Sequence, residues 1–207
     1  RRVVEEIQAL GGRALPVKAD IADEGEVHTM VRQVEAAVGA VDILVSNYAA
    51  AIPRASFAEM TWKQWQEQID TTVKAAFFCV QAVLPGMKAK GWGRIVSINT
   101  IGIHSPSPYY HGYTAAKTAM LGFTRNLAVE VGQYGITVNI VSPGLTLTEE
   151  VTAMLTPEAR AKHEQSLPLR RTGTVEDTAH AVLFFASELS NFVTGHYLPV
   201  CGGQILE

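Results

Sequence analysis

GRIVSINT, residues 93–100, is a glycine followed by a short apolar run that ends in two polar residues. A stretch with helical periodicity follows from about Tyr109 to Tyr134, where Gly135 ends it, and TVNIVSPG at 137–144 is a second apolar run. Nearly continuous apolar runs of this length are typical of strands buried on both faces. A strand, a helix and a strand in this order predict a βαβ unit with parallel strands.

The same alternation continues on both sides of this unit. The other predicted elements are strands at 14–20, 41–46 and 197–200, and helices at 1–10, 24–38, 61–87 and 175–188. Residues 145–172 have only weak periodicity and contain two prolines. The sequence therefore predicts an α/β protein with a doubly wound parallel sheet and helices on both faces. No linker or repeat divides the 207 residues, so we expect a single domain.

The composition excludes several classes of partner. Hydrophobic residues make up 47 % and charged residues 18 % of the chain, and the net charge is −3. The absence of basic stripes and charge runs argues against nucleic acid and anionic membranes. No apolar stretch approaches the roughly 18 residues of a spanning helix, and no signal peptide or metal-binding cluster is visible. The two cysteines, Cys79 and Cys201, form no disulfide framework, so a cytoplasmic location is expected.

Ligands of open α/β sheets bind outside the carboxyl ends of the strands. The residues that close the predicted strands are Asp20, Asn47, Thr100 and the pair Pro143-Gly144. These positions are therefore the first candidates for a binding site.

Tyr113 and Lys117 are the candidates for chemistry, because residues at i and i+4 project from the same face of a helix. A free phenol has a pKa near 10, and a pKa near 7 requires roughly 4 kcal/mol of preferential stabilisation of the phenolate. A desolvated ammonium nearby can supply much of it. The pair suggests proton transfer to or from an alcohol or ketone. The alternative is a surface tyrosine beside a solvated lysine.

Taken together, these segments resemble the short-chain dehydrogenase/reductase family, in particular its branch of 3-oxoacyl-carrier-protein reductases. The matching segments are the strand end at Asp20, Asp42-Ile-Leu-Val, Gly93-Arg-Ile-Val, Tyr113 with Lys117, Asn139 to Gly144, and Thr194-Gly195 followed by Gly202-Gly203. The resemblance implies a Rossmann-like fold and hydride transfer between NAD or NADP and a secondary alcohol or ketone. It also implies a homodimer or homotetramer.

The resemblance assigns roles to four catalytic residues. Tyr113 is the acid/base, and Lys117 lowers its pKa and holds the nicotinamide ribose. Thr100 stands at the place of the catalytic serine, whose hydroxyl orients the substrate carbonyl. Thr72 stands at the place of an asparagine that supports a proton relay, and a hydroxyl does not reproduce the geometry of an amide.

Further residues are implied for the cofactor and the substrate. Besides Tyr113 and Lys117, the cofactor-binding positions are Asp20, Ile21, Asn47, Ala49, Pro143, Gly144, Thr146 and Thr148. Ala49 stands where the family has glycine, so a methyl group occupies a point of close approach. The substrate pocket is expected from the loop 104–110 and from 145–172, which we interpret as a lid.

One part of the family pattern is missing. No GxxxGxG phosphate loop occurs in the 207 residues, and the chain opens inside an amphipathic segment, so it is interpreted as N-terminally incomplete. The family's strand order is 3-2-1-4-5-6-7, and without strands 1 and 2 the strand at 14–20 would stand apart from 41–46. Weak dinucleotide binding is then expected. The alternative function is a non-redox or cofactor-deficient relative that acts as a binding or assembly protein.

Overall fold

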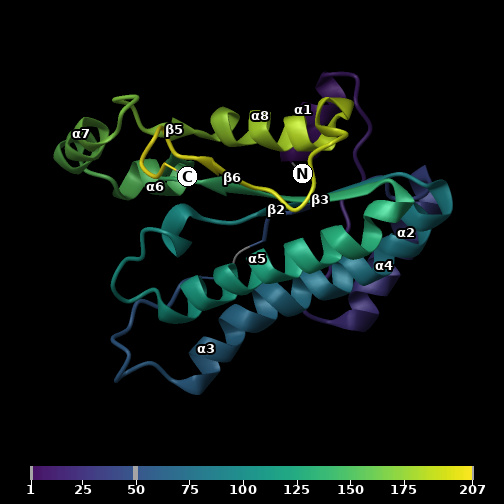
Figure 1. Cartoon of the computed structure of the whole chain (residues 1–207), viewed down its shortest axis with the longest axis horizontal. Coiled ribbons are helices and arrows are strands. Elements are labelled where there is room, and N and C mark those ends of the chain that lie inside the picture. Colours follow the sequence, from purple (N-terminus) through teal and green to yellow (C-terminus); the bar gives the residue numbers. More distant parts are fainter. Residues whose placement is uncertain (1, 49–50, 207) are drawn as a thin grey trace.

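The computed structural model describes residues 2–48 and 51–206. Its centre is a parallel sheet with strand order β1-β2-β3-β6 (Figure 1). The strands are β1 (Ile43–Ser46), β2 (Gly93–Ile98), β3 (Ile136–Pro143) and β6 (Tyr197–Val200). The ladder pairs Leu44 with Ile95, and Ile95 with Val138. The predicted α/β fold with a parallel sheet is confirmed.

Helices cover both faces of this sheet. α4 (Ala75–Lys90) and α5 (His111–Val131) pack on one face, and α2 (Glu24–Val38) packs on α4. α8 (Val175–Ala186) lies on the opposite face, as Figure 1 shows. Alternate residues of β2 serve the two sides, since Ile95 belongs to the core under α4 and α5, whereas Val96 packs with Phe185 of α8. This double burial explains why the strands are continuously apolar.

The helix predicted over 61–87 is divided in the structure. α3 (Trp62–Ile69) begins at a capping box of Thr61 and Gln64 and passes into a π-helical turn, Asp70–Lys74, before α4 begins. The N–H of Ala75 donates to the carbonyl of Asp70, five residues earlier. A π turn inserts one extra residue into a helix, and such turns are frequent at functional sites. Thr72 lies within it.

Two predictions about the first part of the chain are wrong. Residues 14–20 form no strand, because no strand of the described chain lies beside them to complete a ladder. The strand at 41–46 is not buried on both faces. Ile43 and Val45 of β1 are 41 % and 42 % exposed, since no described element covers their face. α1 (Arg2–Ala9) and α2 match the predicted helices at 1–10 and 24–38.

The segment 145–172 contains two short helices that the sequence did not resolve. They are α6 (Glu149–Met154) and α7 (Pro157–Ser166), capped by the hydroxyls of Thr148 and Thr156. Two-residue strands β4 (Thr146–Leu147) and β5 (Gly173–Thr174) bracket them as a second, small parallel sheet.

Short 3-10 turns complete the fold at Ile101–Ile103, Gly132–Tyr134 and Glu188–Ser190. Gly135 ends the second of them with a φ of 69°, and a Cβ at this position would lie 2.4 Å from the carbonyl oxygen of Gly91. Only glycine fits there, and the tight turn sets the entry into β3. Within the described residues, no helix is both long and apolar enough to cross a membrane.

Candidate active site

Thr100, Tyr113 and Lys117 meet at the carboxyl edge of the sheet. Thr100 follows the end of β2, whereas Tyr113 and Lys117 lie on successive turns of α5. The Lys117 Nζ is 5.9 Å from the centre of the Tyr113 ring, and the Thr100 side chain is hydrogen-bonded to the Tyr113 hydroxyl. The three residues that were predicted to carry the chemistry are therefore neighbours.

Lys117 is a buried cation. Its side chain is inside the protein at 5 % exposure, and Nζ donates to the carbonyl oxygen of Ile98 over 2.8 Å. Burial disfavours the charged form and lowers the pKa of Lys117 to about 8. An ammonium has three donors, so the bond to Ile98 leaves two for another acceptor.

The electrostatics of Tyr113 differ from the sequence expectation. Burial raises the pKa of Tyr113 above its ordinary value of 10, a hydrogen bond from Thr100 opposes that rise, and Tyr110 adds to it. The expectation was a pKa lowered by Lys117. Desolvation acts on both partners at once, so each favours its neutral form. Tyr113 therefore holds its proton at neutral pH in the chain alone.

A small cavity lies behind Lys117. Ile21 and Tyr48 line it from the loops after 14–20 and after β1, and Thr72 lines it from the π turn. The structure thus brings Ile21 and Thr72, both predicted as site residues, to the same cavity as Lys117. The carbonyl of Thr72 accepts from Ala75, within the π turn itself.

The other predicted cofactor positions lie at strand ends or in turns. One carboxylate oxygen of Asp20 accepts from the N–H of Ala22, as in an Asx-turn. The Pro143–Gly144 turn follows β3, and the N–H of Gly144 donates to Val200 in β6. A Cβ on Gly144 would lie 3.1 Å from the Cβ of Cys201, which explains the glycine.

Three predicted positions remain. Thr146 donates from its hydroxyl to the carbonyl of Gly144, and Thr148 accepts at the N-terminus of α6, so each has a local structural role. Asn47 directly follows β1 at the carboxyl edge of the sheet. Ala49 lies outside the described residues.

Two site residues were missed by sequence reasoning. Asn99 and Tyr197 are each 4 % exposed, and both hydrogen-bond to the backbone of Thr100. A polar residue directly before Thr100, at the end of an apolar strand, was a signal for Asn99. Tyr197 carried no signal, because it lies 97 residues from Thr100 along the chain.

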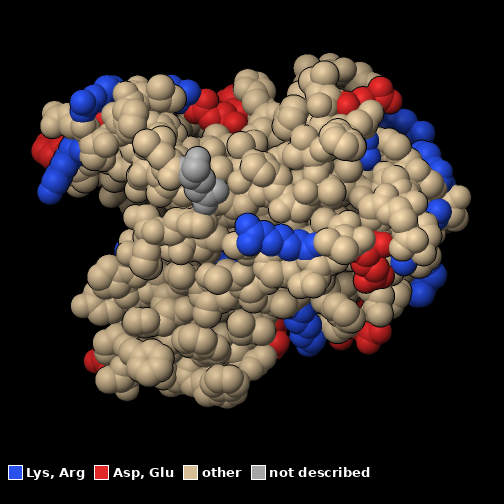
Figure 2. Space-filling view, viewed as in Figure 1, with Lys and Arg blue, Asp and Glu red and all other residues tan. Residues whose placement is uncertain are grey.

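The surface around the site is hollowed between the α7 region and the α3 region, as Figure 2 shows. On the face in view, Lys and Arg side chains lie in separate places among uncharged and acidic residues rather than in one continuous band. The described residues contain no group of three or more His, Cys, Asp and Glu side chains that could hold a metal ion.

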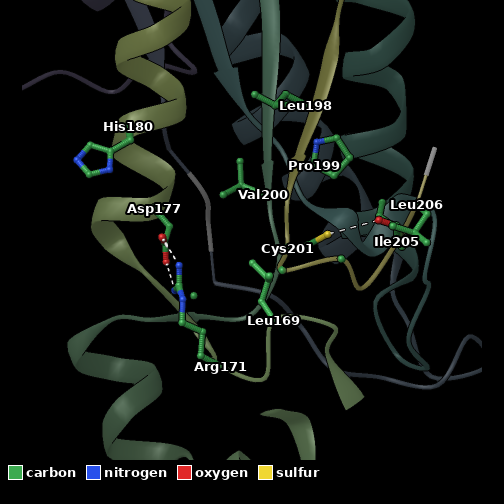
Figure 3. A pocket seen from close by; sticks show the side chains of 13 residues that line it. Leu169, Arg171, Asp177, His180, Leu198, Pro199, Val200, Cys201, Ile205 and Leu206 are labelled. Carbon is green, nitrogen blue, oxygen red and sulfur yellow. Dashed lines mark hydrogen bonds and ion pairs between the residues drawn. The ribbon is translucent and has the colours of Figure 1, made fainter. Parts of the chain in front are cut away.

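A separate pocket lies at the end of β6, where Cys201 faces the C-terminal segment (Figure 3). Arg171 and Asp177 form a two-bond ion pair at its wall, with N–O distances of 2.6 and 2.7 Å. This ion pair holds the pKa of the Asp177 carboxyl well below its usual range. The pocket is therefore framed by a stable pair rather than by an unpaired charge.

Comparisons with known proteins show which sequences and folds the chain is similar to. Residues 1–204 match the family model described as Enoyl-(Acyl carrier protein) reductase. The chain is 36 % identical over 197 residues to Nodulation protein G of Azospirillum brasilense, covering 95 % of this chain and 79 % of that protein. It is 34 % identical over 205 residues to the 3-oxoacyl-[acyl-carrier-protein] reductase FabG of Staphylococcus aureus (strain Mu50), covering 99 % of this chain and 82 % of the relative.

A solved structure has the same fold. A gluconate 5-dehydrogenase from Burkholderia cenocepacia J2315, in complex with NADP and tartrate, superposes with a TM-score of 0.89 at 29 % identity. The match covers 98 % of this chain and 80 % of that one. The 7alpha-hydroxysteroid dehydrogenase of Escherichia coli (strain K12) is 33 % identical over 205 residues, or 99 % of this chain and 80 % of the relative.

Proposed function

The chain belongs to the short-chain dehydrogenase/reductase family and is an NAD(P)-dependent oxidoreductase, and we propose that Tyr113, Thr100 and Lys117 are its catalytic residues. The observation that carries the proposal is their meeting at one edge of the sheet, with Thr100 hydrogen-bonded to Tyr113 and Lys117 buried beside the ring. The substrate is a small molecule with a secondary alcohol or ketone group.

Tyr113 acts as the general acid of ketone reduction. Its raised pKa keeps the phenol protonated at neutral pH, so a proton is ready for the carbonyl oxygen. The Thr100 hydroxyl donates to the same oxygen and stabilises the charge that develops on it. In the reverse direction the phenolate takes the proton of the alcohol, so oxidation is favoured by high pH.

The residues present fit a nicotinamide cofactor, NAD or NADP. When bound, the cofactor supplies or accepts the hydride. Lys117 has two donors left for the ribose hydroxyls, because only one is used by Ile98. Ile21 and Thr72 line the cavity on the far side of Lys117, where Thr72 supports the proton relay.

The remaining cofactor contacts follow the strand ends. Asp20 and Asn47 are assigned to the adenosine side, and the turn Pro143–Gly144 with Thr146 and Thr148 to the nicotinamide side. Residues 145–172 form the substrate lid of a single domain. Apolar side chains of α4 and α5 line a groove that we assign to contact with a second copy, and Phe77 is the exposed one among them at 47 %. Sedimentation equilibrium tests that assignment, and a monomer at micromolar concentration contradicts it.

Ketone-dependent oxidation of reduced nicotinamide tests the function. The relatives' names suggest three ketone classes for a panel: 3-oxoacyl thioesters, keto-gluconates and keto-steroids. The assay uses millimolar NADH and NADPH, so that the affinity for the nucleotide does not limit the rate. At least one ketone should accelerate the loss of nicotinamide absorbance. Equal rates with and without every ketone, with both nucleotides, contradict the proposal.

A further inference from the structure

The backbone of Thr100 is held on both sides by side chains. Its N–H donates to Oδ1 of Asn99 over 2.9 Å, and its carbonyl oxygen accepts from the hydroxyl of Tyr197 over 3.0 Å. The other end of the Asn99 amide, Nδ2, donates to the carbonyl of Lys117 over 2.9 Å. Asn99 thus links the Thr100 peptide to the turn of α5 that carries Lys117.

The Thr100 side chain is fixed as well. Its Oγ1 accepts from the N–H of Gly102 over 3.1 Å, so its single proton remains for another acceptor, and the Tyr113 hydroxyl is the neighbour with which it interacts. A Cβ on Gly102 would lie 3.3 Å from Oγ1 and 3.5 Å from Cγ2 of Thr100. The two branches of the threonine therefore pack against a glycine, and a β-branched side chain has few alternative rotamers.

These contacts converge on one group although they come from distant parts of the chain. Tyr197 begins β6, Asn99 follows β2, and both are almost fully buried. Burying a hydroxyl or an amide is costly unless it is hydrogen-bonded. Both buried side chains form hydrogen bonds with the backbone of Thr100. The ring of Tyr197 also lies 4.9 Å from the ring of His104, in the loop that follows Thr100.

We propose that Asn99 and Tyr197 form a clamp on the Thr100 peptide and are positioning residues, which direct the Thr100 hydroxyl at Tyr113 in the chain alone and at the substrate oxygen once substrate is bound. This inference rests on the proposed function, since it assigns a role toward that same site. It distinguishes Thr100 from a strand-end threonine that only satisfies local backbone groups. A shift of about 1 Å at a catalytic group lowers rates by up to about 100-fold.

Tyr197→Phe tests the clamp, because it removes the hydroxyl and keeps the ring against His104. We expect kcat for the best ketone to fall about tenfold, while the KM of the cofactor changes less than twofold. We also expect the pKa of Tyr113 to rise, since the hydrogen bond from Thr100 opposes the rise caused by burial. The pKa is measured by NMR of protein labelled at the tyrosine ring carbon, and it requires no substrate.

The matched control is Tyr134→Phe, at the far end of α5, where the phenol is 37 % exposed. Neither kcat nor the Tyr113 resonance should change. Asn99→Ala is the second variant and should shift both readouts in the same direction as Tyr197→Phe. Thermal unfolding of each variant shows whether the chain is folded under the assay conditions. If Tyr197→Phe does not fold, Asn99→Ala alone tests the clamp.

A double-mutant cycle tests whether Tyr197 acts on the activity through the Thr100 hydroxyl. In the background of Thr100→Ala, the change Tyr197→Phe should cost no further activity, because the hydroxyl that it positions is gone. A full tenfold loss in that background, or an unchanged pKa of Tyr113 in both clamp variants, overturns the proposal. A third outcome is that the wild type reduces ketones, Tyr113→Phe has lost this turnover, and the clamp variants match the wild type. That outcome refutes the clamp and leaves the proposed function intact. If the proposed function itself is wrong, the result is different, because neither the wild type nor any variant then shows ketone-dependent turnover.

Discussion

Tyr113→Phe is expected to lower kcat by about 10³-fold or more, with less than about a threefold change in the Kd of the cofactor. The variant keeps the ring that packs 6.1 Å from Tyr110 and 5.9 Å from Lys117, and it removes only the proton donor. General acid catalysis contributes about 10² to 10⁴ to such rates, and Tyr113 is the phenol that interacts with the Thr100 side chain, whereas the phenol of Tyr197 bonds to the Thr100 carbonyl. Single-turnover kinetics with each purified variant give the rate of the chemical step.

The control for this change is Tyr110→Phe. Tyr110 lies next to Tyr113 and contacts Arg54 through its ring, so the variant removes a hydroxyl from the same neighbourhood. We expect its kcat within about threefold of the wild type. Turnover of Tyr113→Phe at the wild-type rate would show that the proton comes from elsewhere, and the assignment of Tyr113 would fail.

Lys117→Met is expected to separate activity from stability. Activity should fall by about 10² or more, because the variant loses the cation that we propose to hold the cofactor ribose. At pH 7 the folded chain should nevertheless be more stable by about 1 to 3 kcal/mol. The folded pKa of Lys117 is about 8, against 10.5 for a free lysine, so the charged form is disfavoured by burial. Part of that gain is offset by the lost hydrogen bond to Ile98.

The direction of the pH dependence of stability follows from the number of protons that the folded and unfolded chains bind. Between pH 8 and 10.5 the unfolded chain binds more protons at Lys117 than the folded chain, so wild-type stability rises with pH across this window. The advantage of Lys117→Met should therefore shrink from pH 8 to pH 10.5. Urea unfolding at pH 7, 9 and 10.5 measures it. Lys63→Met, on the exposed face of α3, is the control and should change stability by less than about 0.5 kcal/mol at each pH. A pH-independent difference would contradict the assignment of a buried charge.

The sequence predicted those parts of the fold that depend on local pattern. Apolar runs, caps such as Asp23, and the breaking glycines placed most helices and strands, because burial and turn geometry act within a few residues. The sequence-based predictions failed where the structure of a segment depends on a partner that is distant along the chain. Residues 14–20 have the pattern of a strand, but a strand requires a neighbour, and none of the described strands lies beside them.

The candidate site shows the same division. Tyr113, Lys117 and Thr100 could be predicted from i, i+4 spacing and strand ends. The clamp from Tyr197 could not, because β6 reaches Thr100 only through the packing of the sheet. The π turn also has no periodic signature, since it shifts the helical pattern at Asp70–Lys74 by a single residue. The direction of the Tyr113 pKa was missed for a physical reason, because burial depends on surroundings that only the folded chain defines.

The order of the strands has a consequence for how this chain is made. In the sheet β1-β2-β3-β6 each strand lies beside the one that precedes it along the chain, so these four strands can pair in the order of their synthesis. The connections that lead to β2 and β3 consist mainly of helices, whereas β6 must wait for the longer segment that contains residues 145–172 and α8. Tyr197, at the start of β6, is therefore the last part of the Thr100 environment to leave the ribosome. The hydrogen bonds around Thr100 are therefore complete only after β6 has paired with β3.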